Sequence, residues 1–205
     1  MKKKIKDTGT EELIKQTART IFFAEGNFHA TTQDIATAAG INRALIHYYF
    51  RSRENLFRVV LNEAMEILGN KLQQVFVTEL PFREKIEQFL DLFIDANLEY
   101  PYVEAFIISE INRTPNYEFA LTTKEAERKM RHNLKQELDK EIVEGRITSM
   151  SSDQFIVCLM SLCSYPLLAK PIIKKVAKID EGGYRKFMLQ QKKVILQLLF
   201  GSEKS

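Results

Sequence analysis

The stretch TTQDIATAAGINRALIHYYFRSRENL, residues 31–56, decides the fold, because it carries the start and stop signals of consecutive short helices. Thr31 and Asp34 have the spacing of a capping box, in which a hydroxyl and a carboxylate satisfy the free amides of a first helical turn. Gly40 tolerates the positive φ that commonly ends a helix. The pattern therefore predicts a helix that begins near residue 31 and ends before Gly40.

A second short helix follows at once. Asn42 is a good N-cap, and Ile41 before it can pack on Ile46 as a hydrophobic staple, so the turn is only about three residues long. Ile46 and Phe50 are spaced i, i+4 and are expected to face inward. The residues left for the outer face are Arg43, Ala44, His47 and Tyr48.

These helices, followed by a third that Ser52 would cap, predict a helix-turn-helix that reads double-stranded DNA. In this motif the second helix enters the major groove with its first residues at the base edges. Arg43 is then the main base reader, because its guanidinium can donate two hydrogen bonds to guanine. Asn42 is expected to cap its own helix rather than to contact a base, and the methyl group of Ala44 can touch a thymine methyl.

The same residues resemble the TetR family of bacterial transcriptional regulators. The resemblance rests on the threonine pair, the IA and AGI segments, the aromatic run that ends at Phe50, and the basic-Ser-basic-Glu-x-Leu pattern of residues 51–56. It is strong over about residues 10–58 and weak beyond. It implies an all-α chain with an N-terminal three-helix helix-turn-helix domain, residues 1–58, and a larger helical effector and dimerisation domain, residues 59–205.

The resemblance also implies further DNA contacts. Gln33 matches a base-contacting position in some members and could pair with adenine, although a solvent-facing role is an equal alternative. His47 stands where the family usually has tyrosine, and Tyr49 where it often has histidine. Protonation of His47 would strengthen its contact with phosphate at acidic pH. The residues expected to bind the DNA backbone are Thr31, Thr32, His47, Tyr48, Tyr49 and Arg53.

Charge supports a nucleic-acid partner for the first domain. Residues 1–58 hold ten Lys or Arg against six Asp or Glu, whereas residues 59–205 hold twenty against twenty-one. The positive excess thus lies on the segment expected to meet phosphate. Lys2, Lys3, Lys4 and Lys6 could form a basic arm on the DNA, or a solvated tail.

Composition predicts a chain with an ample apolar core, because 45% of its residues are hydrophobic. Only two cysteines occur, Cys158 and Cys163, and neither a disulfide framework nor a metal site fits their spacing, so we expect both to be inert packing residues. The longest apolar run, residues 155–169, is too short to span a membrane. We therefore expect a bacterial cytoplasmic protein.

Helical periodicity predicts the remaining elements, and no strand-like alternation occurs. A first helix over residues 11–25 would bury Leu13, Ala18, Ile21 and Phe22. A long helix would run from Ser52 towards Val75. Further helices are expected at about residues 82–99, 101–112, 117–145, 151–170 and 183–200.

The helix around residues 155–169 is apolar almost all round and must be covered on both sides. The resemblance implies that it and the final helix form a four-helix interface between two copies of the chain, and a core helix in a monomer is the alternative. An effector cavity is a further expectation for this domain. Its candidate lining residues, which could equally be core, are Phe89, Phe93, Tyr102, Phe106 and Tyr117.

The prediction is thus a homodimeric regulator, most often a repressor in this family, that an unknown small-molecule effector releases from a palindromic operator. One alternative is a DNA-binding dimer whose large domain docks a protein instead. An all-helical enzyme is a remote alternative, because the sequence holds no phosphate-binding Gly-rich loop, no nucleophile motif and no metal-ligand pattern. We therefore expect no catalytic residue, no metal and no cofactor.

Overall fold

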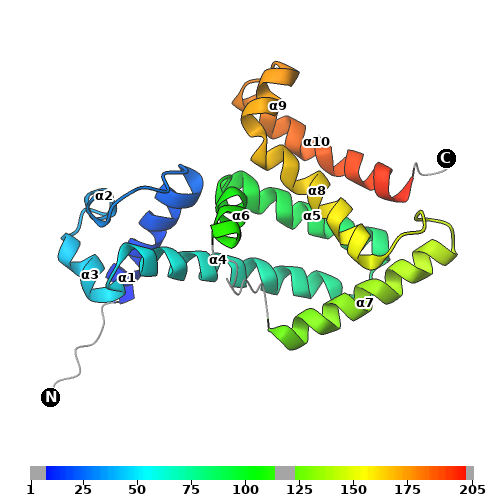
Figure 1. Cartoon of the computed structure of the whole chain (residues 1–205), viewed down its shortest axis with the longest axis horizontal. Coiled ribbons are helices and arrows are strands. Elements are labelled where there is room, and N and C mark those ends of the chain that lie inside the picture. The colour runs from blue at the N-terminus through cyan, green and yellow to red at the C-terminus, as the bar shows by residue number, and fades with distance from the viewer. Residues whose placement is uncertain (1–7, 114–122, 202–205) are drawn as a thin grey trace. The chain divides into compact units, whose positions relative to one another are not determined.

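The computed structural model describes residues 8–113 and 123–201, and in these ranges the chain is helical with no strand. The all-α fold class is therefore confirmed. Figure 1 shows the order of the helices along the chain. The chain divides into two compact units: residues 1–65 with 100–103, and residues 66–99 with 104–205. The domain boundary expected after residue 58 falls inside the long helix α4 and stays a prediction.

The first unit contains the predicted helix-turn-helix. Its helices are α1 (Thr8–Arg19), α2 (Thr32–Ala38), α3 (Arg43–Phe50) and the first part of α4 (Arg53–Phe76). A five-residue π-helical segment, Thr20–Ala24, follows α1 directly. Because this wider segment turns three consecutive side chains towards the core, Ile21, Phe22 and Phe23 are all buried.

Aromatic packing holds this unit together. The ring of Phe57 on α4 lies 4.8 Å from the ring of Phe22 and 5.5 Å from that of Phe23. The predicted inward position of Leu13 is wrong, since Leu13 is exposed and Ile14 is fully buried in its place. The π-helical segment was not predicted, and it changes which side chains of the first helix share a face.

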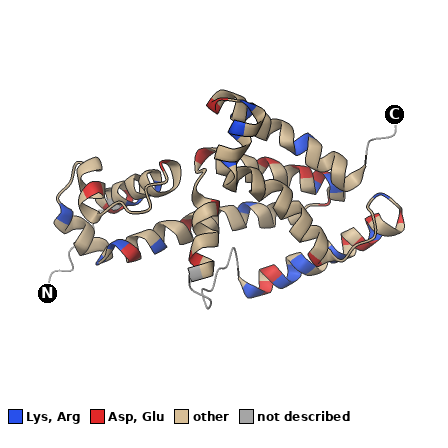
Figure 2. Cartoon of the chain, turned by 45° about the horizontal axis from the view of Figure 1, so that its top comes forward, with Lys and Arg blue, Asp and Glu red and all other residues tan. Residues whose placement is uncertain are grey.

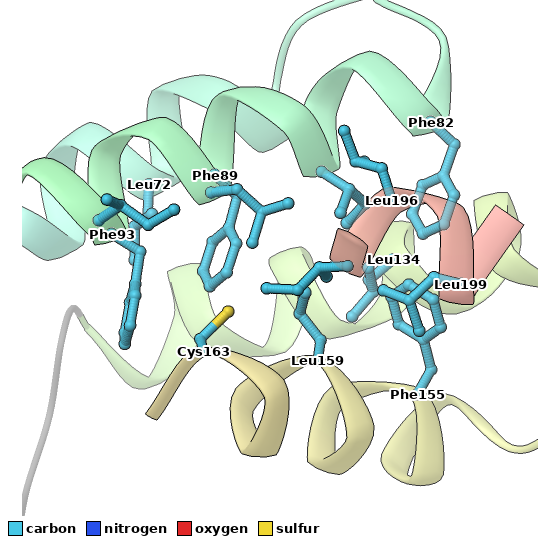
Figure 3. Packing of buried hydrophobic residues seen from close by; sticks show 14 of the residues in the cluster. Leu72, Phe82, Phe89, Phe93, Leu134, Phe155, Leu159, Cys163, Leu196 and Leu199 are labelled. Atoms are coloured by element: carbon cyan, nitrogen blue, oxygen red, sulfur yellow. The ribbon is translucent and has the colours of Figure 1, made fainter. Parts of the chain in front are cut away.

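The second unit is built from the rest of α4 and six further helices. These are α5 (Phe82–Glu99), α6 (Val103–Arg113), α7 (Lys124–Val143), α8 (Ser152–Leu168), α9 (Lys170–Ala177) and α10 (Glu181–Phe200). Helix α5 packs against α10, α8 and α7. Figure 3 shows the core between them, with Phe89 and Phe93 of α5 above Cys163 of α8, and Phe82 of α5 above Phe155 of α8.

Two helix boundaries in this unit differ from the prediction. The helix expected over residues 151–170 is α8, and it ends at Leu168, because Ala169 leaves helical geometry. The short helix α9, with Pro171 in its first turn, follows and was not predicted. The last helix begins at Glu181, where the Asp180 carboxylate accepts a hydrogen bond from Gly183 N at 2.8 Å. The cap starts the helix two residues earlier than predicted and places Gly182 inside it.

In the described part of the chain, no single helix is long and apolar enough to cross a membrane. Only α8 and α9 taken together reach the length and composition of a span, and they are bent by 77° where they meet.

Candidate nucleic-acid interface

The two helix starts of the helix-turn-helix are capped as predicted. Thr31 Oγ1 accepts from Asp34 N at 3.2 Å, and the Asp34 carboxylate accepts from Thr31 N at 2.7 Å. Asn42 Oδ1 accepts from Ala44 N at 2.8 Å, so the side chain of Asn42 is engaged as a cap. Gly40 between the helices has a φ of +66°. The local chemistry read from residues 31–44 is confirmed.

Helix α3 presents the expected face to solvent. Ile46 and Phe50 are buried, which seats the helix on the first unit's core. Arg43, Ala44, His47 and Tyr48 are exposed. Tyr49 is half-buried, and its ring lies edge-on to that of Tyr48 at 5.0 Å. The exposed face is thus free of the protein's own core and open to a partner.

The side chain of Arg43 crosses from α3 to α2. Its Nε donates to Thr32 Oγ1 at 2.9 Å, which joins the first residues of the two helices. Gln33, next to Thr32, is exposed and donates from Nε2 to Thr37 Oγ1 at 3.3 Å. The structure therefore places the candidate base readers Arg43 and Gln33, and the candidate phosphate ligand Thr32, at the first residues of α2 and α3.

A hollow of about 200 Å³ lies beside this bridge. Its lining residues are Thr32, Arg43, Ile46, His47, Arg51, Ser52 and Arg53. The segment from Arg43 to Arg58 carries four arginines against one glutamate (Figure 2). A hollow lined by arginine, histidine and hydroxyl groups suits an anion such as a phosphate.

Arg51 and Ser52 belong to this hollow, although the sequence reasoning did not select them as contacts. Arg51 ends α3 with a φ of 68° and a ψ of −46°, and Ser52 N donates to Phe50 O at 2.8 Å across it. This is a γ-turn, a strained conformation for a residue with a side chain. The available signal was the basic residue at the start of the run RSRENL, which indicated only the resemblance to the family.

Thr31 and Arg53, two residues expected to bind phosphate, use their polar atoms in hydrogen bonds to other residues of the chain. The Thr31 hydroxyl donates to Asp34 Oδ2 at 2.8 Å as part of the capping box. The Arg53 guanidinium donates to the carbonyl oxygens of Ala30 and Phe28 and lies over the ring of Phe22. Their roles as phosphate ligands stay predictions, and these contacts give both residues a structural role.

The described candidate effector residues are divided between the two units. Phe89 and Phe93 are buried and stacked at 5.8 Å in the second unit's core, and Phe106 on α6 is half-buried. Tyr102 belongs to the first unit, where its amide donates to Phe23 O and its ring lies edge-on to Phe28. Tyr117 lies outside the described residues.

A partly buried carboxyl also lies in the second unit, beside Cys163. Glu104 of α6 accepts a hydrogen bond from the Ser164 hydroxyl of α8, and burial raises the pKa of Glu104. Burial and the neighbouring Glu104 also raise the pKa of Cys163, to about 12. Cys163 is therefore an unreactive packing residue as expected, whereas Cys158 is exposed and the packing role expected for it is wrong.

Within the described ranges, no group of three or more His, Cys, Asp or Glu side chains is placed to hold a metal ion.

An exposed, basic second helix on a capped helix-turn-helix defines a DNA-binding class of protein. Residues 9–60 match the family model described as bacterial regulatory proteins, tetR family. The chain is 28% identical over 131 residues to the HTH-type transcriptional repressor KstR2 of Mycolicibacterium smegmatis, an alignment that covers 62% of this chain and 63% of that protein. Residues 9–60 therefore match the DNA-binding segment of the tetR family, which confirms the resemblance predicted for this part of the chain.

Solved structures extend the likeness to the whole fold. The ketosteroid transcriptional regulator KstR2 of Mycobacterium tuberculosis matches with a TM-score of 0.67 and 16% identity, over 96% of this chain and 97% of that one. A TetR family transcription regulator from Marinobacter aquaeolei VT8 matches with a TM-score of 0.54 and 14% identity, over 91% and 95%. At these identities the likeness establishes the fold.

Proposed function

We propose that this protein is a homodimeric, sequence-specific transcriptional repressor that leaves a palindromic operator when a small molecule binds its second unit. The single observation that carries the proposal is the exposed face of α3, which begins at Arg43 and borders the arginine-lined hollow. A basic helix start suits base edges in the major groove, and the hollow suits a flanking phosphate. The match of residues 9–60 to the tetR family supports the same function.

Dimerisation is proposed through α8 and α10, which pack on each other within the second unit. Both helices leave large apolar side chains in solvent: Val157 is 63% exposed and Tyr165 58% on α8, and Leu198 is 66% exposed on α10. Large exposed apolar side chains on two helices that pack together are typical of surfaces that a partner covers. A twofold copy would cover them and bring two helix-turn-helix motifs to the two halves of a palindrome.

The effector is proposed to be an amphipathic small molecule. Stacked phenylalanines, Phe89 and Phe93, would meet its apolar body, and the Glu104 carboxyl with Ser164 would meet a polar group. Such a ligand can release DNA only if it binds the released conformation more tightly than the bound one. Because the relative from Mycobacterium tuberculosis is titled a ketosteroid regulator, ketosteroids are a reasonable first set of probes.

Selection of bound duplexes from random DNA tests the function directly. We expect an inverted repeat, with each half-site read by one copy of α3. Arg43→Ala should then lose about 10- to 100-fold in affinity for the selected duplex, the amount that a bidentate guanine contact supplies. Enrichment of no sequence, or Arg43→Ala binding as tightly as the parent protein, would contradict the proposal.

A further inference from the structure

The hydrogen bond between Arg43 and Thr32 suggests how the side chain that reads a base is held in position. Arg43 Nε donates to Thr32 Oγ1 at 2.9 Å, although the two residues are eleven apart in the chain and lie on different helices. Arg43 is exposed and Thr32 half-buried, so water competes for the same donors and acceptor. A bond in this setting contributes little to folding, and its main physical effect is to restrict the Arg43 side chain.

The donor used in this contact matters for recognition. Arginine has five N–H donors, one on Nε and four on its two terminal nitrogens. Because Thr32 takes only Nε, both terminal nitrogens of Arg43 remain available as a fork for guanine O6 and N7. A guanidinium held at Nε therefore points its fork away from Thr32, towards whatever faces the start of α3.

We propose that Thr32 is a positioning residue that sets the base specificity of Arg43, an inference that rests on the proposed DNA-reading function. The sequence alone suggested only a phosphate contact for Thr32. A threonine hydroxyl accepts through its lone pairs while its own proton stays available to donate. Thr32 can thus hold Arg43 and still contact a phosphate, and the two roles predict different losses when the hydroxyl is removed.

The role of the neighbouring Thr31 supports the assignment of Thr32 as a positioning residue. The helix cap is supplied by Thr31, whose hydroxyl both accepts from Asp34 N and donates to the Asp34 carboxylate. Thr32 is the first residue of α2 and takes no part in that capping box. Removal of the Thr32 hydroxyl therefore leaves the cap of the helix in place.

The loss of DNA affinity expected for Thr32→Val follows from the free-energy cost of ordering the Arg43 side chain. Fixing a flexible side chain on binding costs about 0.5 to 1.5 kcal/mol, which corresponds to roughly 2- to 12-fold in affinity. An Arg43 already held in place loses less freedom on meeting guanine. We therefore expect Thr32→Val to weaken binding to the selected palindromic duplex roughly 2- to 12-fold.

The test compares Thr32→Val, Thr32→Ser and Thr17→Val in the full-length chain. Each variant is titrated with the selected duplex, with the same duplex carrying 7-deazaguanine at the guanine that Arg43 reads, and with an unrelated duplex, over a series of salt concentrations. Thr32→Ser keeps the hydroxyl, and Thr17→Val removes a hydroxyl whose hydrogen bond to Leu13 O stays within α1. Thr32→Val is also made in an Arg43→Ala background, so that the coupling of the two residues is measured.

The expected result has four parts. Thr32→Val loses discrimination against the 7-deazaguanine duplex, but keeps the parent's affinity for the unrelated duplex and the parent's salt dependence. Thr32→Ser and Thr17→Val behave like the parent. In the Arg43→Ala background, Thr32→Val has no further effect on any of the three duplexes.

Other results would overturn the inference. An equal loss on all duplexes with a shallower salt dependence would make Thr32 a direct phosphate ligand. A full loss by Thr32→Val in the Arg43→Ala background would show that Thr32 does not act through Arg43. Failure of the parent protein to bind any duplex would instead refute the proposed function, and the inference with it.

Discussion

The Arg53 guanidinium donates through Nε to the carbonyl oxygen of Ala30 at 2.7 Å, which ties the start of α4 to the segment that leads into α2. A second donor, Nη2, binds the carbonyl oxygen of Phe28, and the guanidinium carbon lies 5.3 Å from the centre of the Phe22 ring. These contacts join residues more than twenty positions apart. Arg53, which the sequence predicts as a phosphate ligand, therefore joins separate segments of the first unit, and we call this set of contacts the Arg53 clamp.

Arg53→Ala should destabilise the protein more than loss of an exposed arginine does. It removes two charge-assisted hydrogen bonds and leaves two partly buried carbonyl oxygens without their donor, so we expect the free energy of unfolding to fall by about 1 to 3 kcal/mol. Urea denaturation followed by circular dichroism measures this change. Arg58→Ala is the control: Arg58 is exposed and donates to Asn55 one turn away, so a change within about 0.5 kcal/mol is expected. Equal effects of the two variants would rule out the clamp.

Arg51→Gly should stabilise the fold while it weakens DNA binding. Glycine adopts the positive φ of the γ-turn without strain, and relief of about 1 to 3 kcal/mol is partly offset by the 0.5 to 1 kcal/mol that glycine loses in entropy on folding. We expect a net gain of about 1 kcal/mol in thermal or urea unfolding. Loss of a phosphate contact should lower the salt slope of DNA binding by about 0.9 per protomer.

Arg51→Ala separates these two effects. It removes the charge but keeps a Cβ in the strained turn, so the loss of salt dependence should match that of Arg51→Gly without the gain in stability. If Arg51→Gly kept the parent's salt slope, Arg51 would not contact phosphate. If it unfolded more easily than Arg51→Ala, the turn would not be strained.

The buried carboxyl of Glu104 should make the second unit less stable as pH rises. Burial raises the pKa of Glu104 above its ordinary value of 4.5, so the folded chain keeps its proton where the unfolded chain releases it. Stability is then lost from about pH 4.5 upward, until the pH passes the raised pKa of the folded state. Glu104→Gln removes this loss, and its unfolding free energy should exceed the parent's by more at neutral pH than at pH 4.5.

The control for this prediction is Glu66→Gln. Glu66 is exposed on α4, so the same substitution there does not alter a buried group. Urea denaturation of the three proteins from pH 4.5 to neutrality supplies the comparison. A difference between Glu104→Gln and the parent that shrinks as pH rises would mean that the carboxylate of Glu104 is favoured by the fold.

Leu198→Asp should convert the proposed dimer to monomers without unfolding the chain. Leu198 is 66% exposed on α10, so a charge there costs little in the monomer but much inside an apolar interface. Analytical ultracentrifugation gives the mass, and circular dichroism checks the helix content. Val143→Asp places the same charge on a residue of α7 that is 86% exposed, outside the proposed interface, and should stay dimeric. A dimeric Leu198→Asp protein would place the interface elsewhere.

Local interactions explain how much of this fold could be predicted. A cap joins residues two or three apart, as Thr31 with Asp34 and Asn42 with Ala44 do, so its parts can be found in the sequence before any tertiary contact is known. Spacing likewise indicated that Ile46 and Phe50 turn inward. The helix-turn-helix, its outer face and the family follow from such signals.

The π-helical segment shows where periodicity failed. Over residues 11–25 an ordinary helical repeat places Leu13 inward, but the wider turn at Thr20–Ala24 buries Ile21, Phe22 and Phe23 together and leaves Leu13 in solvent. The packing of Phe22 and Phe23 on Phe57 favours this turn. Phe57 is more than thirty residues away, so the cause lies outside any local window.

The sequence by itself determined the class of this protein: the capped helices, the exposed α3 and the arginines around it. The tertiary structure alone decided how those groups are used, since it ties Arg53 to backbone carbonyls, joins Arg43 to Thr32, and places Tyr102 in the first unit and Phe89 in the second. The physical reason is the distance along the sequence over which each kind of interaction acts. Helix caps and amphipathic faces act within a turn or two of the chain, whereas a long side chain takes whichever partner the folded backbone brings within hydrogen-bonding distance.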